Sequence, residues 1–376
     1  MINKLKQFLK PKYETFNVLE IKRQFILDNY QYLKEMQLAA DIFPVLKSNA
    51  YGHGLKEMCL ILNDSKAEMV VVDSFPEAQI AYRYFKKNIL ILGEMPLKAY
   101  SYCDLSRTEF CVYNSNSLEA LAKLGRAKIH LFVNSGMNRE GIQNLSSFLE
   151  NNKSILASLE VVGICSHLAA SEEAGDSNDK QLNKFLSDVD ILQNAGFNPR
   201  WVHLGNSAAI FSLSSDRLTA FRSGLSLYGY NPFSEENDNF IKAEKLKPAL
   251  RLSSTVVSLQ NLSVGDKVSY NGIYQATKPS KSALIPFGYY EGLPRDLSNL
   301  AKLSWQGRYL QIAGRICMNL TCLAIDDLPV KLGDKIEIIS WNKEAANSLP
   351  KLAKLSNKII YEILVGLQSN IRRTIL

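Results

Sequence analysis

Several features that would assign this 376-residue chain to a particular class are missing from it. No stretch approaches the ~18 consecutive apolar residues that a membrane-spanning helix needs. The basic N-terminal segment, residues 1–13, has no uninterrupted apolar run and so does not match a secretory signal. None of the six cysteines belongs to a Cys-x-x-Cys pair or to an array with metal-ligand spacing. We therefore expect buried thiols, no metal site, no membrane association and a cytoplasmic location.

Concentrated positive charge is missing as well. The formal net charge is +7, and Lys and Arg are spread along the chain with no basic block that alternates with aromatic residues. Because nucleic-acid-binding proteins concentrate basic residues on one surface, we expect no nucleic-acid partner. What the chain does have is 46% hydrophobic residues, which is enough for two domains or for one large barrel with an addition.

Apolar runs alternate with helical patterns over the first two-thirds of the chain. Eight candidate strands cover residues 43–47, 69–73, 88–92, 109–113, 129–133, 159–165, 201–204 and 222–227. Apolar residues at three- and four-residue steps predict helices in most of the gaps, the clearest at 182–192 with Gly196 as its C-cap. Eight strands separated by helices fit a (β/α)8 barrel, usually about 250 residues long. A doubly wound open sheet is the competing architecture.

The pattern changes near Leu246, after which short strands joined by turns replace the alternation. These candidate strands cover residues 255–259, 267–270, 282–289, 310–318, 321–325 and 335–339. We expect three parts: an N-terminal tail or edge strand over residues 1–16, a barrel over 17–245 and a mainly β domain over 246–376.

One stretch, residues 44–54 with the sequence PVLKSNAYGHG, indicates a specific chemistry. Its apolar run ends at Lys47 and then breaks into a loop that contains Gly52 and Gly54. A lysine at the end of a buried strand presents one amine at the rim of a sheet, and an amine with little hydration is the better nucleophile toward a carbonyl cofactor. A lone lysine in this position is more often an ordinary surface residue. In a barrel, however, chemistry belongs at the carboxyl ends of the strands, and other polar residues also follow predicted strands. They are residues 134–139, His167, 206–207 and 222–225.

This stretch resembles the pyridoxal-phosphate lysine motif of the alanine racemases, and further segments are similar to other motifs of that family. They are residues 129–139, 162–167, 203–207, 222–229, 267–270, 285–292 and 314–319, and they occur in the expected order. Each segment alone is weak evidence, because glycine turns are common and a histidine at a strand end is more often structural. Together they make the resemblance specific from about residue 16 to 365.

The resemblance implies that pyridoxal 5'-phosphate is bound as an imine to Lys47 and that further residues hold this cofactor. Those implied to bind the phosphate or to lie in its loops are Tyr51, Asn206, Ser207, Gly224 and Leu225. His167 is implied to pack by the pyridine ring, and Arg222 to face the ring nitrogen. Because an arginine does not readily give up its proton, the ring is expected to be a weaker electron sink, which would suppress transamination.

The same resemblance implies a homodimer with shared active sites. Racemisation needs proton transfer on both faces of a planar carbon, so one base is insufficient. Lys47 is implied to take the α-proton of D-alanine, and Tyr270 of a second subunit that of L-alanine. Arg139 and the Met318 backbone of the second subunit are implied to bind the substrate carboxylate. A chain from Tyr270 through His167 to Arg222 is expected to favour the phenolate, and the D-alanine product is expected to supply peptidoglycan.

The chain departs from the family pattern at a few positions. Phe132 stands where many members have a lysine, often carbamylated, that orients the arginine, so we expect Asn134 or a bound anion to hold Arg139. Asn319 and Glu291 stand where aspartates are usual.

Three alternatives remain open at this point. A racemase for serine or for a broader set of amino acids is the first, because pocket size sets substrate breadth. A decarboxylase of the same barrel class fits less well, because Tyr270 and Met318 match the racemase pattern. A non-catalytic pyridoxal-phosphate carrier belongs to a different class, and because such carriers are essentially a barrel alone, the second domain argues against it.

Overall fold

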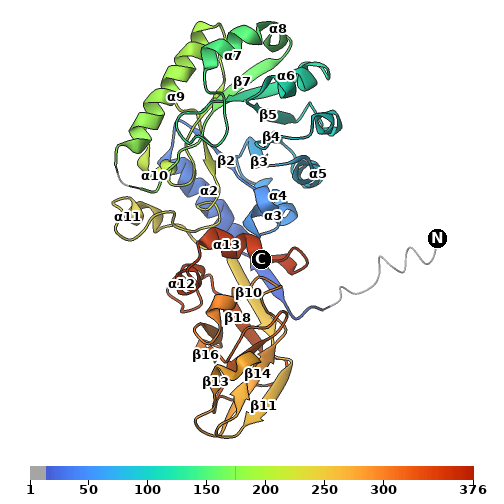
Figure 1. Cartoon of the computed structure of the whole chain (residues 1–376), viewed down its shortest axis with the longest axis vertical. Helices are drawn as coiled ribbons and strands as arrows, with labels where there is room; N and C mark the ends of the chain where they lie inside the picture. Colours follow the sequence, from blue (N-terminus) through green and yellow to red (C-terminus); the bar gives the residue numbers. More distant parts are fainter. Residues whose placement is uncertain (1–13, 174) are drawn as a thin grey trace, which may run out of the picture. The chain divides into compact units, whose positions relative to one another are not determined.

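The computed structural model describes residues 14–173 and 175–376 (Figure 1). The predicted N-terminal tail, residues 1–16, therefore lies almost entirely outside the described residues. The chain forms two compact units, which we describe separately. Among the described residues, one unit comprises 22–173, 175–249 and 375–376, and the other comprises 14–21 and 250–374.

The first unit is a barrel of eight parallel strands. They are β2 (Asp41–Pro44), β3 (Met69–Val72), β4 (Asn88–Ile91), β5 (Thr108–Val112), β6 (Lys128–Phe132), β7 (Glu160–Cys165), β8 (Trp201–His203) and β9 (Ala220–Ser223). Strands β3 to β8 form one parallel sheet in chain order, and β2 pairs with β9 in parallel. A bridge from Val45 to Val71 joins β2 to β3, and the Arg222 N–H donates to the Gly205 carbonyl after β8 at 2.9 Å. The sheet therefore closes, which confirms the predicted (β/α)8 barrel and excludes an open doubly wound sheet.

Helices precede, connect and follow these strands. They are α2 (Arg23–Met36), α3 (Lys47–Tyr51), α4 (Leu55–Leu62), α5 (Phe75–Tyr84), η1 (Leu97–Tyr102), α6 (Ser115–Ala122), α7 (Leu145–Asn151), α8 (Lys153–Leu156), α9 (Ser177–Asn194), α10 (Ala209–Ser212) and α11 (Phe240–Ala243). Side chains of Asn114 and Asn144 accept N–H groups of the first turns of α6 and α7 and so cap these helices. Gly196 follows α9 with a φ of +90°, as its predicted role at the C-terminus requires. In the described residues, no helix combines the length and the apolar character needed to cross a membrane.

Apolar side chains form a buried cluster inside the barrel, on inward-facing strand positions. The buried cluster contains Phe43, Met69, Val71, Leu90, Cys111, Phe132, Cys165 and Trp201, with Val45 and Ala220. Cys111 and Cys165 are buried free thiols, and burial raises the pKa of Cys111 well above its usual value. Phe132, at 7% exposure, is part of this core and so has a packing role.

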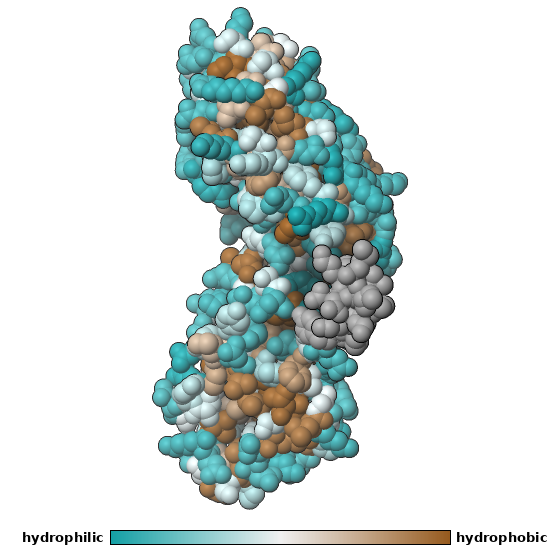
Figure 2. All heavy atoms as spheres, turned by 90° about the vertical axis from the view of Figure 1, so that its right-hand side faces the viewer, coloured by the Kyte–Doolittle hydropathy of each residue, from teal (hydrophilic) through white to brown (hydrophobic). Residues whose placement is uncertain are grey.

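The second unit is a sheet of nine strands whose described pairings are antiparallel, which confirms the predicted mainly β domain. Their order is β11-β14-β17-β16-β15-β18-β10-β1-β19, with bounds Ser258–Leu262, Ser280–Ile285, Thr321–Ala324, Arg308–Ile312, Lys302–Trp305, Lys335–Ile339, Leu250–Thr255, Val18–Ile21 and Arg372–Ile375. The shorter elements are the hairpin β12 (Lys267–Val268) and β13 (Tyr274–Gln275), η2 (Tyr270–Gly272), η3 (Arg295–Leu297), α12 (Leu349–Leu355) and α13 (Ile360–Gly366). In a space-filling view, apolar residues gather on the visible face of this unit (Figure 2).

Candidate active site

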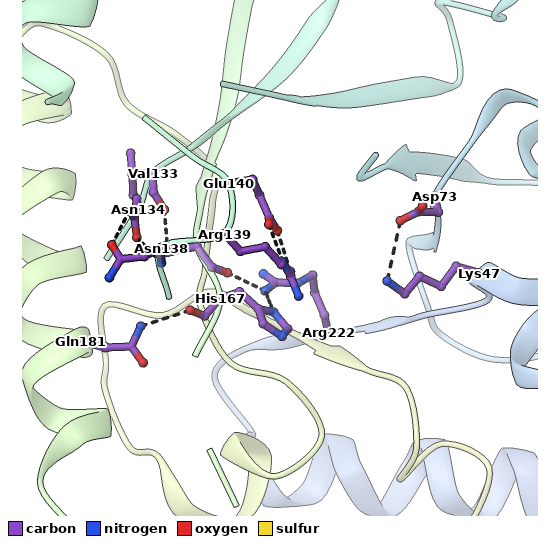
Figure 3. Close-up of polar contacts among 11 residues, drawn as sticks. Lys47, Asp73, Val133, Asn134, Asn138, Arg139, Glu140, His167, Gln181 and Arg222 are labelled. Carbon is purple, nitrogen blue, oxygen red and sulfur yellow. Dashed lines mark hydrogen bonds and ion pairs between the residues drawn. The ribbon is translucent and has the colours of Figure 1, made fainter. Parts of the chain in front are cut away.

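The predicted site residues of the first unit come from one end of the barrel. Lys47 follows β2, Arg139 follows β6, and His167 follows β7. Ser207 follows β8, while Arg222 lies in β9 near its carboxyl end. Since the carboxyl ends of parallel strands meet at one rim, these side chains share that rim, and the close-up shows Lys47, Arg139, His167 and Arg222 together (Figure 3).

Lys47 begins a short turn of unusual conformation. Residues 48–51 all have positive φ, between 50° and 54°, which costs an L-residue roughly 1–2 kcal/mol each. The Glu77 carboxylate holds this turn against β3, because it accepts the Ser48 N–H at 2.6 Å and the Asp73 N–H at 2.8 Å. Burial raises the pKa of Glu77. The sequence predicted a loop here; the strain is tolerated because these contacts fix the backbone that presents Lys47.

The Lys47 amine lies 3.7 Å from the Asp73 carboxylate. The Lys47 side chain is 39% exposed and that of Asp73 is 52% exposed. The amine is therefore a partly solvated member of an ion pair. Such a pair contributes little to stability, and so Asp73 bears on the charge at the rim more than on folding.

Arg222 and His167 form the buried side of the site. The Arg222 guanidinium, at 4% exposure, donates to the Ser166 carbonyl at 2.6 Å and lies 3.3 Å from His167 Nδ1. Burial, and then the positive charges of Arg222 and Arg139, lower the pKa of His167 to about 3. His167 is therefore neutral at pH 7 and accepts from Arg222 at Nδ1. This contact corresponds to one half of the predicted chain from Tyr270, which belongs to the other unit.

The low pKa of His167 predicts a pH-dependent stability. An unfolded histidine takes up a proton near pH 6.5, whereas His167 in the folded chain stays neutral down to about pH 3. Stability should therefore be lost as the pH falls below 6.5, by up to ~1.4 kcal/mol per pH unit for this proton. His167→Gln should lose that part of the slope when denaturant unfolding is measured from pH 8 to pH 4.5. Identical slopes for the variant and the parent would contradict the neutral assignment.

A set of donors surrounds Ser207. Its Oγ accepts the N–H groups of Gly224 at 3.0 Å and Ser226 at 3.2 Å, which leaves its own O–H to donate elsewhere. A Cβ added at Gly224 would lie 2.7 Å from the Tyr51 hydroxyl, so only glycine lets this hydroxyl approach the backbone. The Ser226 hydroxyl is buried without a hydrogen-bond partner in the described residues. Neutral hydroxyl donors gathered in this way suit a phosphate.

Two other predicted cofactor residues have local roles. The Asn206 carboxamide oxygen accepts the N–H groups of Ala208 and Ala209 and so starts α10. Leu225 is buried, and its carbonyl accepts the N–H groups of Tyr228 and Tyr230. These contacts shape the loops that carry Ser207 and Gly224.

Arg139 is held by a residue that we did not expect. Both oxygens of the neighbouring Glu140 accept from it, one from Nε and the other from an Nη group at 2.6 Å. This hydrogen bonding raises the pKa of Arg139. Asn134 does not hold it, because its oxygen accepts the N–H groups of Gly136 and Asn138. The expectation for Asn134 is therefore wrong, and the anion beside Arg139 is the chain's own carboxylate.

The remaining predicted residues lie in the second unit. Tyr270 is 67% exposed and Met318 is 55% exposed. The predicted strand 267–270 is shorter than expected, since Ser269 has a φ of +64° and this residue turns the chain out of β12. Glu291 and Asn319, both departures from the family pattern, bind each other at 2.7 Å. Glu291, which is one carbon longer than the usual aspartate, therefore contacts Asn319, the amide at the other position where an aspartate is usual.

Comparison with known proteins identifies the family. Family models for the N-terminal and C-terminal domains of alanine racemase match residues 21–232 and 249–375. An alanine racemase of Borreliella burgdorferi is 31% identical over 90% of this chain and 91% of its own length. The crystal structure of the Bacillus anthracis alanine racemase with bound L-Ala-P has a TM-score of 0.89 at 28% identity and covers 97% of this chain and 96% of its own. The Bartonella henselae alanine racemase with covalently bound pyridoxal phosphate has a TM-score of 0.83 at 26% identity, covering 96% of this chain and 100% of its own. The chain therefore belongs to the alanine racemase family of isomerases.

Proposed function

We propose that this chain interconverts L-alanine and D-alanine with pyridoxal 5'-phosphate bound through Lys47, that it works as a cytoplasmic homodimer, and that its product supplies peptidoglycan. One observation carries the proposal. Lys47 begins a turn that the Glu77 carboxylate holds in place, and it lies at the same barrel rim as buried Arg222 and the Ser207 hydroxyl.

The residues of the rim fit this cofactor. The hydroxyls of Tyr51 and Ser207 and the backbone N–H of Leu225 would hold its phosphate, beside the close approach that Gly224 allows, and Arg222 would face its ring nitrogen. When bound, the cofactor supplies a carbonyl carbon for attachment to an amine and a conjugated ring that draws electrons from the α-carbon. The covalently bound pyridoxal phosphate of the Bartonella henselae relative supports this part of the proposal.

Two side chains move the α-proton in this mechanism. The Lys47 amine takes it on one face of the α-carbon, and the phenol of Tyr270 from a second copy of the chain takes it on the opposite face. The high exposure of Tyr270 and Met318 supports this assignment, because residues that serve a neighbouring subunit must be accessible on the free protomer. The Asp73 carboxylate lies 3.7 Å from the Lys47 amine and so stands beside this base.

Arg139 binds the substrate carboxylate in this proposal. Glu140 occupies two of its five N–H donors, Nε–H and one on Nη2, which leaves the others for the substrate. Many family members orient this arginine with a lysine at the position that Phe132 occupies in this chain. In this proposal, Glu140 orients Arg139 instead.

Glu140→Gln tests this role. Losing the charged partner should let the Arg139 side chain move, and KM for alanine should rise about 10-fold with a smaller change in kcat. Steady-state kinetics with L-alanine and with D-alanine as the substrate measure the changes in KM and kcat separately. Glu150→Gln, an exposed position on α7, is the matched control and should change neither constant. A fall in kcat at constant KM would contradict a role in substrate binding.

Solvent exchange tests the function itself. In deuterated buffer, the purified protein with pyridoxal phosphate should exchange the α-hydrogen of L- and D-alanine, and α-hydrogen loss is followed by NMR across a panel of amino acids. Equal exchange into serine or other amino acids would make the enzyme a broad-spectrum racemase. A yellow protein that borohydride bleaches but that exchanges no α-hydrogen would be a carrier, and the proposal would be wrong.

A further inference from the structure

A line of four buried polar side chains runs from Arg222 into the barrel interior. Arg222 Nη1 lies 2.7 Å from His203 Nδ1, His203 Nε2 lies 2.8 Å from His130 Nδ1, and His130 Nε2 lies 2.8 Å from the Glu109 carboxylate. None of the four is more than 4% exposed. They come from β9, β8, β6 and β5, so the line crosses the barrel.

The donor-only character of arginine sets the direction of the hydrogen bonds in this line. Arginine can only donate, so His203 Nδ1 must accept and carries no proton. Burial, followed by the charge of Arg222, lowers the pKa of His203 well below its usual value, so this ring is neutral and its single proton is on Nε2. That N–H then donates to His130 Nδ1, and His130 Nε2–H donates to Glu109. Three hydrogen bonds therefore point the same way, from a permanent cation to a carboxylate.

The fold makes room for this line at one position. The pairing of β6 with β7 shifts its register between Ile129 and His130. Gly163 of β7 lies next to the imidazole, and a Cβ added there would come within 2.1 Å of His130 Nδ1. Any other residue at 163 would displace His130, so the absence of a side chain at this strand position is what lets the ring bond to His203.

We propose that Glu109 is a positioning residue for the reaction at the barrel rim: acting through His130 and His203, it fixes both histidine tautomers and so holds the Arg222 guanidinium in place. This inference rests on the proposed function, in which Arg222 faces the cofactor. The Glu109 carboxylate supplies the terminal acceptor of this line. Removal of the acceptor leaves a buried N–H without a partner, and His130 can then turn its proton toward His203 and break the line.

The first test is direct and needs no cofactor. The chain has only four histidines, so a sample labelled with ¹⁵N-histidine gives a spectrum simple enough to assign. In the full-length cofactor-free protein, His130 and His203 should both be neutral and protonated at Nε2. A proton on Nδ1 of either ring in the parent protein would overturn the proposal, whatever the enzyme does.

Two substitutions at one position then separate positioning from packing. The carboxamide oxygen of Glu109→Gln can still accept from His130, so tautomers and kcat should stay within about 2-fold of the parent. Glu109→Leu removes the acceptor, so the tautomer signals should change and kcat should fall about 10- to 100-fold with KM for alanine nearly unchanged. The exposed Glu119→Gln on α6 controls for loss of a carboxylate. If the leucine variant keeps the parent's spectrum and kcat, Glu109 only fills space, and the proposal fails.

A failure here is distinguishable from a failure of the proposed function. If the parent exchanges the α-hydrogen of alanine but its tautomers differ from those given above, only the positioning role is wrong. If the tautomers agree and the parent exchanges no α-hydrogen, the proposed function is wrong, and with it the reaction that Glu109 would serve.

Discussion

Lys47→Ala should abolish racemisation in both directions, with kcat reduced by about 10³-fold or more. Two contributions disappear together: the amine to which the cofactor is attached, and the base for one face of the α-carbon. Borohydride should no longer fix the cofactor to the protein, which mass spectrometry of the intact chain can measure. Because the side chain is 39% exposed and forms its ion pair with exposed Asp73, the variant should unfold at nearly the parent's temperature.

Lys56→Ala is the matched control for this experiment. Lys56 is an exposed lysine on α4, in the helix that follows the Lys47 turn. It should keep both borohydride fixation and activity. A Lys47→Ala protein that folds, is still fixed by borohydride and still exchanges both isomers would show that another amine carries the cofactor.

Tyr270→Phe should give an asymmetric loss. Exchange of the α-hydrogen of L-alanine should fall about 10²- to 10⁴-fold, whereas D-alanine should still exchange with retention, because Lys47 is intact. Net racemisation must slow equally in both directions, since the two isomers have equal free energy in solution. The measurement is therefore α-hydrogen loss from each isomer in deuterated buffer, followed before the isomers interconvert.

The structure offers a control for the phenol in the same unit. Tyr309 on β16 is also exposed, at 45%, and it lies outside the segments that resemble the family motifs. Tyr309→Phe should leave both exchange rates unchanged. Equal losses for L- and D-alanine in Tyr270→Phe would count against its assignment to one face.

The barrel could be predicted from the sequence because its strands are short, apolar and separated by helices. Met69–Val72, for example, is four buried apolar residues in a row, as expected for a parallel strand covered on both faces. The turn after Lys47 could not be predicted in this way. Four successive residues with positive φ have no sequence signature here, and they depend on Glu77, which approaches from the next βα unit.

Some site residues could likewise be predicted from the sequence, and others could not. Residues that match a motif, such as Lys47, Arg139 and Arg222, could be proposed from the sequence. Their partners could not, because the closeness of Asp73 to Lys47 and of Glu109 to His130 depends on how the strands are placed in the barrel. Glu140 is different. This acid directly follows Arg139 in the sequence, so it could have been proposed as the partner of Arg139 in place of Asn134.

A mixing experiment tests the two-base assignment most directly. Lys47→Ala and Tyr270→Phe, each nearly inactive in racemisation, are unfolded and refolded together so that subunits exchange. A mixed dimer has one site with both substitutions and one with neither, so random pairing should restore about one quarter of the parent's racemisation. No recovery, in a mixture shown by mass spectrometry to contain mixed dimers, would mean that the two residues do not act from different subunits on one α-carbon.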